Sequence, residues 1–266
     1  MSGDFDGKVV VVTGASTGLG RAIAVETAAK GAQTVVVNFA HSADEAAETA
    51  ALVRAKGAEA VVVQADVASD EGCKQIAAAA QRFGRIDALF NNAGTTKFAN
   101  NHADLDAVSM DDFLRLYQVN VVGAFQMIRA ARALLEAGEA PGAVVNTSSI
   151  AAVLGIGSSV PYAASKGALN TMTLSLARAL APKIRVNAVC PGFIDTPWFG
   201  RGMSQEAVAN MRKAVASATP LKVASTAEDI AASAVFLGSS ASRHITGETL
   251  IVDAGTHLGF AALVAR

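Results

Sequence analysis

The amino-acid sequence predicts a single α/β domain: a doubly wound, parallel sheet of about seven strands with helices on both faces. Short β-branched runs alternate with alanine-rich segments of helical length, and the runs are apolar on both faces, as buried parallel strands are. No Pro/Ser-rich linker divides the chain, so residues 1–266 are taken as one domain. The expected strands are 9–13, 34–38, 60–64, 86–90, 143–147, 184–190 and 249–252.

Helix start signals fit this alternation. Ser42-x-x-Glu45 and Ser225-x-x-Glu228 have the spacing of capping boxes, and Ser109-x-x-Asp112 is a looser version of one. The segments between the strands therefore have plausible first turns.

Composition excludes several classes of partner. The chain has 22 basic and 23 acidic side chains, so no general field attracts nucleic acid or an anionic membrane. No apolar stretch approaches the ~20 residues of a membrane span, and the first residues lack the apolar core of a secretion signal, so we expect a cytoplasmic protein. Cys73 and Cys190 lack C-x-x-C spacing and the four histidines form no ligand-spaced cluster, which predicts reduced thiols and no metal.

A glycine-rich turn follows the first expected strand. Gly14, Gly18 and Gly20 permit a tight turn, and the following helical segment would offer unpaired N–H groups to a pyrophosphate. Ser16, Thr17 and Leu19 belong to the same expected site. The turn lacks the Gly-Lys-Ser/Thr ending of a P-loop, which disfavours a nucleotide triphosphatase.

The same turn permits a less favoured interpretation. Gly14-Ala-Ser16-Thr-Gly18 matches the G-x-S-x-G pattern in which Ser16 would be a hydrolase nucleophile. That fold takes an oxyanion N–H from a loop after an earlier strand, whereas only one expected strand precedes this turn. A serine hydrolase therefore stays a minor alternative.

A second motif carries acid–base chemistry. Tyr162 and Lys166 are four residues apart in a helical segment, so both side chains lie on one face. A neighbouring cation favours the phenolate and would make Tyr162 a usable acid or base at neutral pH. Ser149 ends a strand-like run, where its hydroxyl could hold a substrate oxygen.

Together with Asn91-Asn92-Ala93-Gly94, Asn120 and Pro191-Gly192 in order, these motifs make residues from about Lys8 to Gly255 resemble the short-chain dehydrogenase/reductase family. The likeness includes members of the 3-oxoacyl carrier-protein reductase and glucose dehydrogenase types. It implies a Rossmann-type NAD(P)(H)-dependent oxidoreductase that interconverts a carbonyl and an alcohol. Tyr162 would be the acid/base, Ser149 would orient the carbonyl, Lys166 would also bind the nicotinamide ribose, and Asn120 would hold a water in a proton relay.

The resemblance also implies cofactor contacts. Asp66 and Val67 would lie at the adenine ring, and Asn92, Ala93 and Gly94 at the adenosine ribose. At the nicotinamide end it implies Pro191, Gly192, Ile194 and Thr196. Asp66 could instead be only a turn residue, and Thr196 only a helix cap. The loop 95–107 looks longer than the family's, and 181–185 one residue shorter, which leaves the substrate open.

The second strand bears on the cofactor. An acidic residue at its end would favour NAD, but Asn38 stands there, and neither Thr17 nor Ala40 is basic. His41 and Ser42 could contact a 2′-phosphate, although Ser42 is equally well explained as a helix cap. We expect NADP(H), with NAD(H) or dual use possible, and a shift to NAD preference in Asn38→Asp.

A substrate lid is expected over about 193–220. Phe193, Trp198 and Phe199 would form apolar walls with Leu154 and Ile156, which predicts a ketone or secondary alcohol with an apolar body. Ordinary core packing of these aromatics is the alternative. The apolar segment 168–180 and the family resemblance suggest a homotetramer or dimer. A non-catalytic dinucleotide-binding redox sensor is the alternative function.

Overall fold

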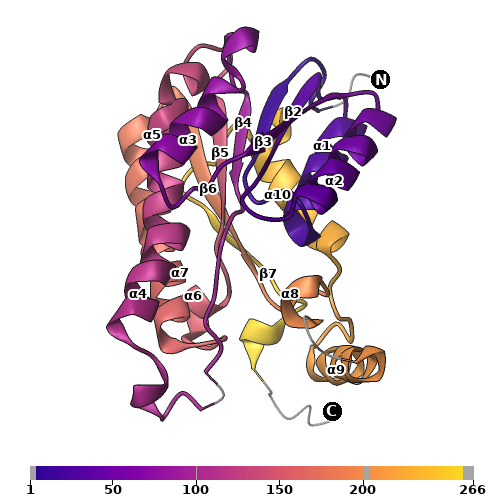
Figure 1. The fold of residues 1–266 in the computed structure, drawn as a ribbon, viewed down its shortest axis with the longest axis vertical. Coiled ribbons are helices and arrows are strands. Elements are labelled where there is room, and N and C mark those ends of the chain that lie inside the picture. Colours follow the sequence, from indigo (N-terminus) through magenta and orange to yellow (C-terminus); the bar gives the residue numbers. More distant parts are fainter. Residues whose placement is uncertain (1–3, 100, 201–203, 260–266) are drawn as a thin grey trace.

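The computed structural model describes residues 4–99, 101–200 and 204–259, and its centre is a seven-stranded parallel sheet (Figure 1). The strand order is β3-β2-β1-β4-β5-β6-β7. This confirms the predicted architecture and strand number. The strands span Val9–Val12 (β1), Thr34–Phe39 (β2), Glu59–Gln64 (β3), Ala88–Asn91 (β4), Gly142–Thr147 (β5), Ile184–Pro191 (β6) and Thr249–Val252 (β7).

Burial follows position in the sheet. Every residue of β1, β2, β4 and β6 is buried, whereas the edge strands β3 and β7 are partly exposed. The fourth strand starts two residues later than the sequence predicts. The Asp87 carboxylate accepts a hydrogen bond from the Val9 backbone N–H at 2.8 Å, so regular pairing with β1 begins only beyond it.

Helices cover both faces, as expected. Three pack on one face: α1 (Gly18–Ala29), α2 (Ala43–Ala55) and α10 (Ala227–Gly238). The opposite side carries α3 (Asp70–Ala78), α4 (Met110–Tyr117), α5 (Ala124–Leu135) and α7 (Val160–Leu180). A further long helix is α9 (Gln205–Ala218). Shorter elements are α6 (Ala151–Leu154), α8 (Pro197–Gly200), a π-helical turn (Gln118–Gly123), and 3₁₀ turns at Gln81–Phe83, Leu105–Ala107, Ser240–Ser242 and Thr256–Leu258.

Two of the three expected capping boxes differ from the structure. Ser109 and Asp112 form one, but Ser42 makes no side-chain cap hydrogen bond, and Thr226 with Asp229 replaces Ser225 with Glu228. The Ser225 carbonyl accepts from the Asp195 N–H at 2.8 Å, and Asp195 forms an isolated parallel bridge with Thr226. Thr226 is therefore extended, and α10 begins at Ala227, one residue later than a cap at Ser225 predicts. Ser42 is thus not explained as a side-chain cap.

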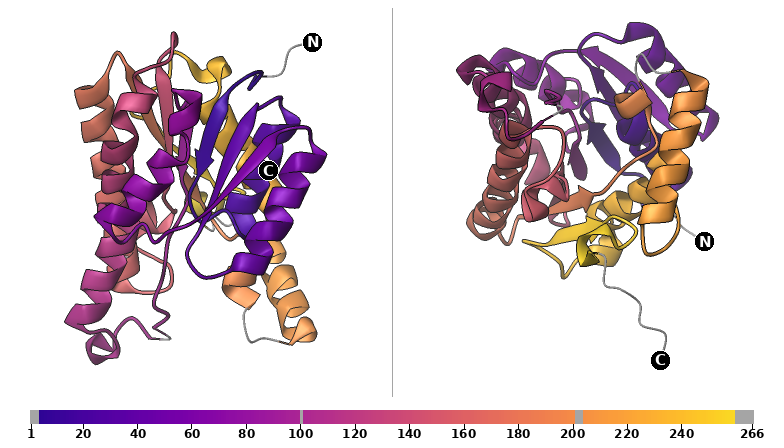
Figure 2. Two further views of the ribbon diagram at one scale, coloured as in Figure 1. Left: turned by 45° about the horizontal axis from the view of Figure 1, so that its top comes forward. Right: turned by 90° about the horizontal axis from the view of Figure 1, so that it is seen from below.

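The strand order reverses between β1 and β4, which is where open α/β sheets bind ligands at their carboxyl edge. Seen from below, α4 and α7 lie on one side of this edge, and α8 and α9 lie on the other (Figure 2). Within the described ranges, no helix has the length and apolar character needed to cross a membrane.

Candidate active site

A cavity of about 1160 Å³ opens at the carboxyl edge of the sheet. Its wall brings together the glycine-rich turn, the ends of β2 and β4, the residues after β5 and β6, and the first half of α7. Expected site residues that line it are Gly14, Ser16, Thr17, Gly18, Leu19, Asn38, His41, Ser42, Asp66, Val67, Asn92, Ala93, Gly94, Ser149, Ile156, Tyr162, Lys166, Pro191, Gly192, Phe193, Ile194, Thr196, Trp198 and Phe199. Gly20, Asn120 and Leu154 do not line it.

The glycine-rich turn is built by close backbone approach. Gly14 and Gly18 have φ of +61° and +54°, values that side chains disfavour. A β-carbon on Gly20 would collide with the Gly14 carbonyl oxygen, so Gly20 shapes the turn from behind without facing the cavity. Thr17 makes no side-chain cap bond to α1, so its hydroxyl does not occupy the first N–H groups of this helix.

Asn38 is engaged inside the protein. Its side chain is 1% exposed: Oδ1 accepts from the Gly14 N–H at 3.2 Å, and Nδ2 donates to the Ala65 carbonyl at 2.9 Å and the Val63 carbonyl at 3.3 Å. Asn38 therefore ties the glycine-rich turn to β3, and its amide is not free to read a ribose hydroxyl. The expected effect of Asn38→Asp on cofactor preference loses its physical basis.

The end of the cavity where the adenosine is expected lies between the ends of β2 and β3. Asp66 lines this end, and its Oδ1 also accepts from the Ala68 N–H at 2.9 Å, so it is a turn residue as well as a wall. Ala40 and Ser42 are partly buried and His41 is exposed on the opposite wall. Asn92 braces the glycine-rich turn, because its Nδ2 donates to the Thr13 and Gly14 carbonyls at 3.1 Å each.

Tyr162, Lys166 and Ser149 meet at the other end. Burial raises the pKa of Tyr162, and a hydrogen bond from Ser149 lowers it in part. Lys166 is 4% exposed, donates from Nζ to the Thr147 carbonyl at 2.7 Å, and lies 5.7 Å from the centre of the Tyr162 ring. Burial lowers the pKa of Lys166 to about 8. A protonated phenol and a partly desolvated ammonium thus share this end of the cavity.

Asn120 lies in the π-helical turn between α4 and α5, a departure from α geometry that is frequent near functional sites. It is 2% exposed: Oδ1 accepts from the Thr95 N–H at 2.9 Å, and Nδ2 donates to the Thr95 carbonyl and Ser165 Oγ at 3.0 Å each. Its side chain therefore supports the loop after β4 and the helix of Tyr162 from beneath the cavity.

Close contacts at Gly18 and Gly192 shape the end of the cavity where the nicotinamide is expected. A β-carbon on Gly18 would come within 3.3 Å of Thr196 Cγ2, and one on Gly192 within 2.8 Å of Asp253 Cβ. The glycine-rich turn therefore approaches the segment after β6 directly. Thr196 lies just before α8 and lines the cavity.

Aromatic rings form the remaining wall. Phe193 and Phe199 lie 4.9 Å apart, and Phe98 meets Phe199 edge-to-face at 6.5 Å between ring centres. Trp198 is 40% exposed and lines the cavity, so it is not a core residue. Leu154 does not belong to this wall, since it does not line the cavity. Residues 201–203 of the expected lid lie outside the described residues.

Phe98 was not among the residues predicted from the sequence, although the loop 95–107 was expected to be unusually long. This loop is tied to the segment after α6, since the Ala99 N–H donates to the Ser158 carbonyl at 2.8 Å and Thr96 Oγ1 contacts Ser158 Oγ. The signal that could have identified Phe98 is an aromatic residue shortly after Gly94 in a loop expected at the active-site edge. Arg115 of α4 also lines the cavity and was not anticipated.

The structure shows no grouping suited to a metal among the residues it describes. Cys73 and Cys190 are both buried and unpaired with each other. Burial raises the pKa of Cys73 to about 11, and it also raises the pKa of Cys190. Both thiols are therefore protonated near neutral pH.

Comparison with known proteins agrees with this geometry. Residues 14–257 match a family model described as enoyl-(acyl carrier protein) reductase. The chain is 39% identical to a protein of Streptomyces violaceoruber described as ketoacyl reductase 2 of the granaticin polyketide synthase, covering 94% of this chain and 96% of the relative. It is 36% identical to the L-rhamnose 1-dehydrogenase (NAD(P)(+)) of a Sphingomonas strain, and the match covers 96% of this chain and 98% of that relative.

Solved structures give the same result. A protein of Burkholderia xenovorans, described as a short-chain dehydrogenase/reductase, superposes with a TM-score of 0.87 at 39% identity, covering 95% of this chain and 99% of that one. Sequence and structure thus agree over nearly the whole length. The chain belongs to the short-chain dehydrogenase/reductase family, whose members are NAD(P)-dependent oxidoreductases that act on carbonyl and alcohol groups.

Proposed function

We propose that this protein transfers a hydride between NADP(H) or NAD(H) and a ketone or secondary alcohol with an apolar body, using Tyr162 as acid/base. The observation that carries the proposal is the meeting of Tyr162, Ser149 and Lys166 in the cavity, opposite the glycine-rich turn. The residues present fit a dinucleotide, because the first N–H groups of α1 would hold its pyrophosphate, and it would supply the hydride.

The side chains of the protein would provide proton transfer, orientation of the substrate and stabilisation of charge. Tyr162 is protonated at neutral pH because burial raises its pKa, so it can donate its hydroxyl proton to the oxygen of a carbonyl that is being reduced. Ser149 orients that oxygen by a hydrogen bond. Lys166, charged below pH of about 8, stabilises the phenolate left behind and would bind the nicotinamide ribose. Asn120 would take part in returning the proton through a water.

For the cofactor, we propose NADP(H), with NAD(H) accepted. No carboxylate lies at Ala40 to Ser42, where the ribose 2′ substituent would be, and Ser42 Oγ is not used as a cap. Asp44 and Glu45 in the first turn of α2 oppose a 2′-phosphate, which argues for tolerance rather than strict selection.

The proposed substrate class follows from the aromatic wall of the cavity that Tyr162 also lines. Phe98, Phe193, Trp198 and Phe199 line it, and such surfaces bind apolar bodies better than polyols. The two relatives above act on different groups: one is described as a ketoacyl reductase, the other as a sugar dehydrogenase. The aromatic wall favours the first kind.

We also propose a homotetramer or dimer in the cytoplasm. Four large apolar side chains are between 42% and 59% exposed on one side of the protein: Leu114 on α4, Val122 in the π-helical turn, Phe125 on α5 and Leu174 on α7. Such side chains are suited to burial against a second copy of the chain. A scattering mass that stays near 27.0 kDa at all concentrations would contradict association.

The decisive experiment is turnover, followed at the nicotinamide absorbance band with a panel of ketones and alcohols and both cofactors. Tyr162→Phe should lower kcat by about 10²-fold or more while leaving the cofactor Kd nearly unchanged. Tyr117→Phe is the matched control, since Tyr117 is the other of the two tyrosines and lies on α4 outside the cavity lining.

Two alternatives are separated by the same assay. A redox sensor would bind the dinucleotide and show no substrate-dependent absorbance change. The hydrolase that would use Ser16 is contradicted by the family, and the Ser16 carbonyl serves instead as an anchor of the glycine-rich turn.

A further inference from the structure

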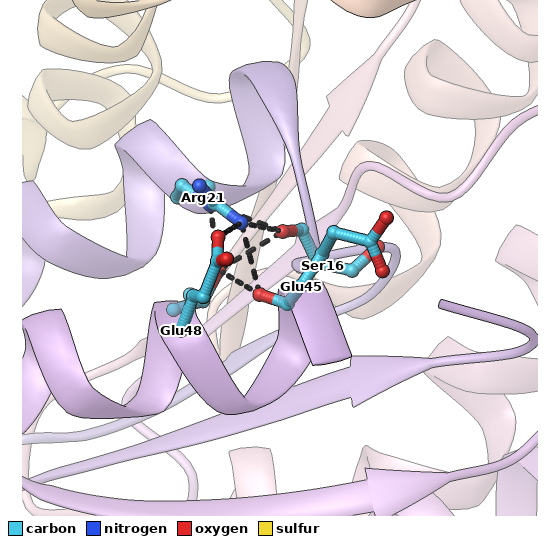
Figure 3. Close-up of polar contacts among 5 residues, drawn as sticks. Ser16, Arg21, Glu45 and Glu48 are labelled. Atoms are coloured by element: carbon cyan, nitrogen blue, oxygen red, sulfur yellow. Dashed lines mark hydrogen bonds and ion pairs between the residues drawn. The ribbon is translucent and has the colours of Figure 1, made fainter. Parts of the chain in front are cut away.

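Arg21 joins the glycine-rich turn to helix α2 (Figure 3). Its Nε and Nη2 donate to the Ser16 carbonyl at 3.0 and 2.8 Å. The same guanidinium reaches α2, where Nη2 donates to the Glu45 carbonyl at 3.0 Å and Nε to Thr49 Oγ1 at 2.9 Å. One planar group therefore contacts the phosphate-binding turn and the first turns of the next helix.

Thr49 completes the link. It is fully buried, and its hydroxyl lies 3.0 Å from both the Ser16 and Glu45 carbonyls. The Ser16 carbonyl thus has three donor contacts for two lone pairs. Because the peptide group between Ser16 and Thr17 is planar, fixing this carbonyl also fixes the direction of the Thr17 N–H.

The two segments that Arg21 joins are the two walls of the adenosine ribose site. Ser16 and Thr17 line the cavity on one side, and Ala40, His41 and Ser42, which lead into α2, line it on the other. Tyr162 and Lys166 mark the nicotinamide end, so a dinucleotide whose pyrophosphate lies on α1 places its adenosine ribose between these walls. The width of this gap is set by how α2 docks on the turn.

We propose that Arg21, with Thr49, is a positioning residue that fixes the gap holding the ribose 2′ substituent, and that it governs affinity for the 2′-phosphate without touching it. The inference rests on the proposed function, in which NADP(H) occupies this site. The planar guanidinium of Arg21 fixes the distance between the glycine-rich turn and α2, because its Nε and Nη2 must reach acceptors on both segments at once.

A variant of Glu48 distinguishes the effect of the charge of Arg21 from the effect of its hydrogen-bond geometry. Arg21 Nη2 lies 3.0 Å from Glu48 Oε2, but the Glu48 side chain is 65% exposed, so this contact contributes little in water. Glu48→Gln removes the ion pair and leaves the contacts to Ser16, Glu45 and Thr49. It is therefore the control in which only the charge partner changes.

The test measures Kd for NADPH and NADH by nicotinamide fluorescence, with kcat at saturating cofactor. Arg21→Met should raise the Kd of NADPH at least 10-fold and that of NADH no more than about 3-fold, with kcat within 2-fold of wild type. Glu48→Gln should stay within 2-fold for both cofactors. Arg132→Met, which removes another exposed arginine–glutamate pair on α5, should do the same.

Two further variants keep the inference testable if Arg21→Met folds poorly. Arg21→Lys retains the charge but cannot span both segments, so NADPH affinity should stay reduced at least 3-fold; full recovery would overturn the inference. Thr49→Val should likewise weaken NADPH more than NADH. Equal loss of both cofactors in these variants would also overturn it. A wild-type protein that binds neither dinucleotide would instead overturn the proposed function.

Discussion

The backbone of Gly14 rests directly on Ala93: a β-carbon at Gly14 would lie 2.8 Å from the Ala93 α-carbon. The turn after β1 and the loop after β4 are therefore in contact at the topological switch point of the sheet. Any side chain at position 14 would push the turn after β1 away from the loop after β4. The proposed pyrophosphate site on the turn would then shift relative to the proposed adenosine ribose site on the loop.

Gly14→Ala should therefore weaken both stability and cofactor binding. The left-handed φ of +61° costs about 1–2 kcal/mol for a side chain, and the collision adds about 1–3 kcal/mol. Chemical denaturation and cofactor titration measure the two effects.

Gly7→Ala is the matched control. Gly7 has a φ of +66°, but its β-carbon would meet nothing within 4 Å. Gly7→Ala should lower the unfolding free energy only by the cost of the left-handed φ, and it should leave the cofactor Kd unchanged. Equal losses in the two variants would mean that contact with Ala93 is unimportant.

The sequence predicted what depends on local pattern. Buried parallel strands are recognisable from β-branched runs, and the Tyr162–Lys166 pair from helical spacing, because both depend on neighbouring residues. Boundaries shifted where a long-range contact intervened, as at Asp87, whose carboxylate takes the place of a strand hydrogen bond.

The partners of polar side chains were less predictable. Position alone suggested that Asn38 faces the ribose, but its amide partners come from two distant segments: Gly14 from the glycine-rich turn, and Val63 and Ala65 from the end of β3. Phe98 likewise acquires its role from the fold, which brings the loop after β4 against α8. Such contacts depend on tertiary arrangement and leave no periodic signal.

Asn38→Asp should destabilise the protein rather than convert its cofactor preference. The carboxylate would lose the donors to Val63 and Ala65 and place an oxygen near the Ala65 carbonyl, at a site 1% exposed. A loss of about 3 kcal/mol or more in unfolding free energy is expected at neutral pH.

Ala40→Asp provides the contrast, because Ala40 lines the cavity and is only partly buried. It should lower kcat/KM for NADP relative to NAD with little loss of stability. A clean switch to NAD in Asn38→Asp, with normal unfolding, would show that the amide contacts are dispensable.

Lys166 should make stability depend on pH. Its pKa is about 8 in the folded protein against 10.5 for the free group. Below pH of about 8 the ammonium is charged in both states and its burial opposes folding; as pH rises from 8 to 10.5, only the unfolded chain keeps the proton, so this penalty disappears.

The comparison is with Lys166→Met. Relative to that variant, the unfolding free energy of the wild type should rise by on the order of 3 kcal/mol across this range. The difference between the two proteins cancels the titration of Cys73, which both retain and which Lys166 does not affect. Lys166 also lowers the pKa of Cys190 in part, so the same comparison is repeated with Cys190→Ala in both backgrounds. A pH-independent difference would show that Lys166 is solvated in the folded state.

The aromatic wall predicts how substrates are discriminated. Trp198 is 40% exposed and Phe98 54% exposed on the cavity, so truncating either removes ligand contact without opening a core cavity. Trp198→Ala and Phe98→Ala should each raise KM about 10-fold for ketones with an aliphatic or cyclic body, which corresponds to the loss of roughly 1–2 kcal/mol of apolar contact. KM for small polar carbonyls, cofactor Kd and the melting temperature should change little. Phe236→Ala is the matched control, since Phe236 is 42% exposed on α10 and does not line the cavity. Equal loss on polar and apolar substrates would mean that these rings hold the site together rather than bind the substrate body.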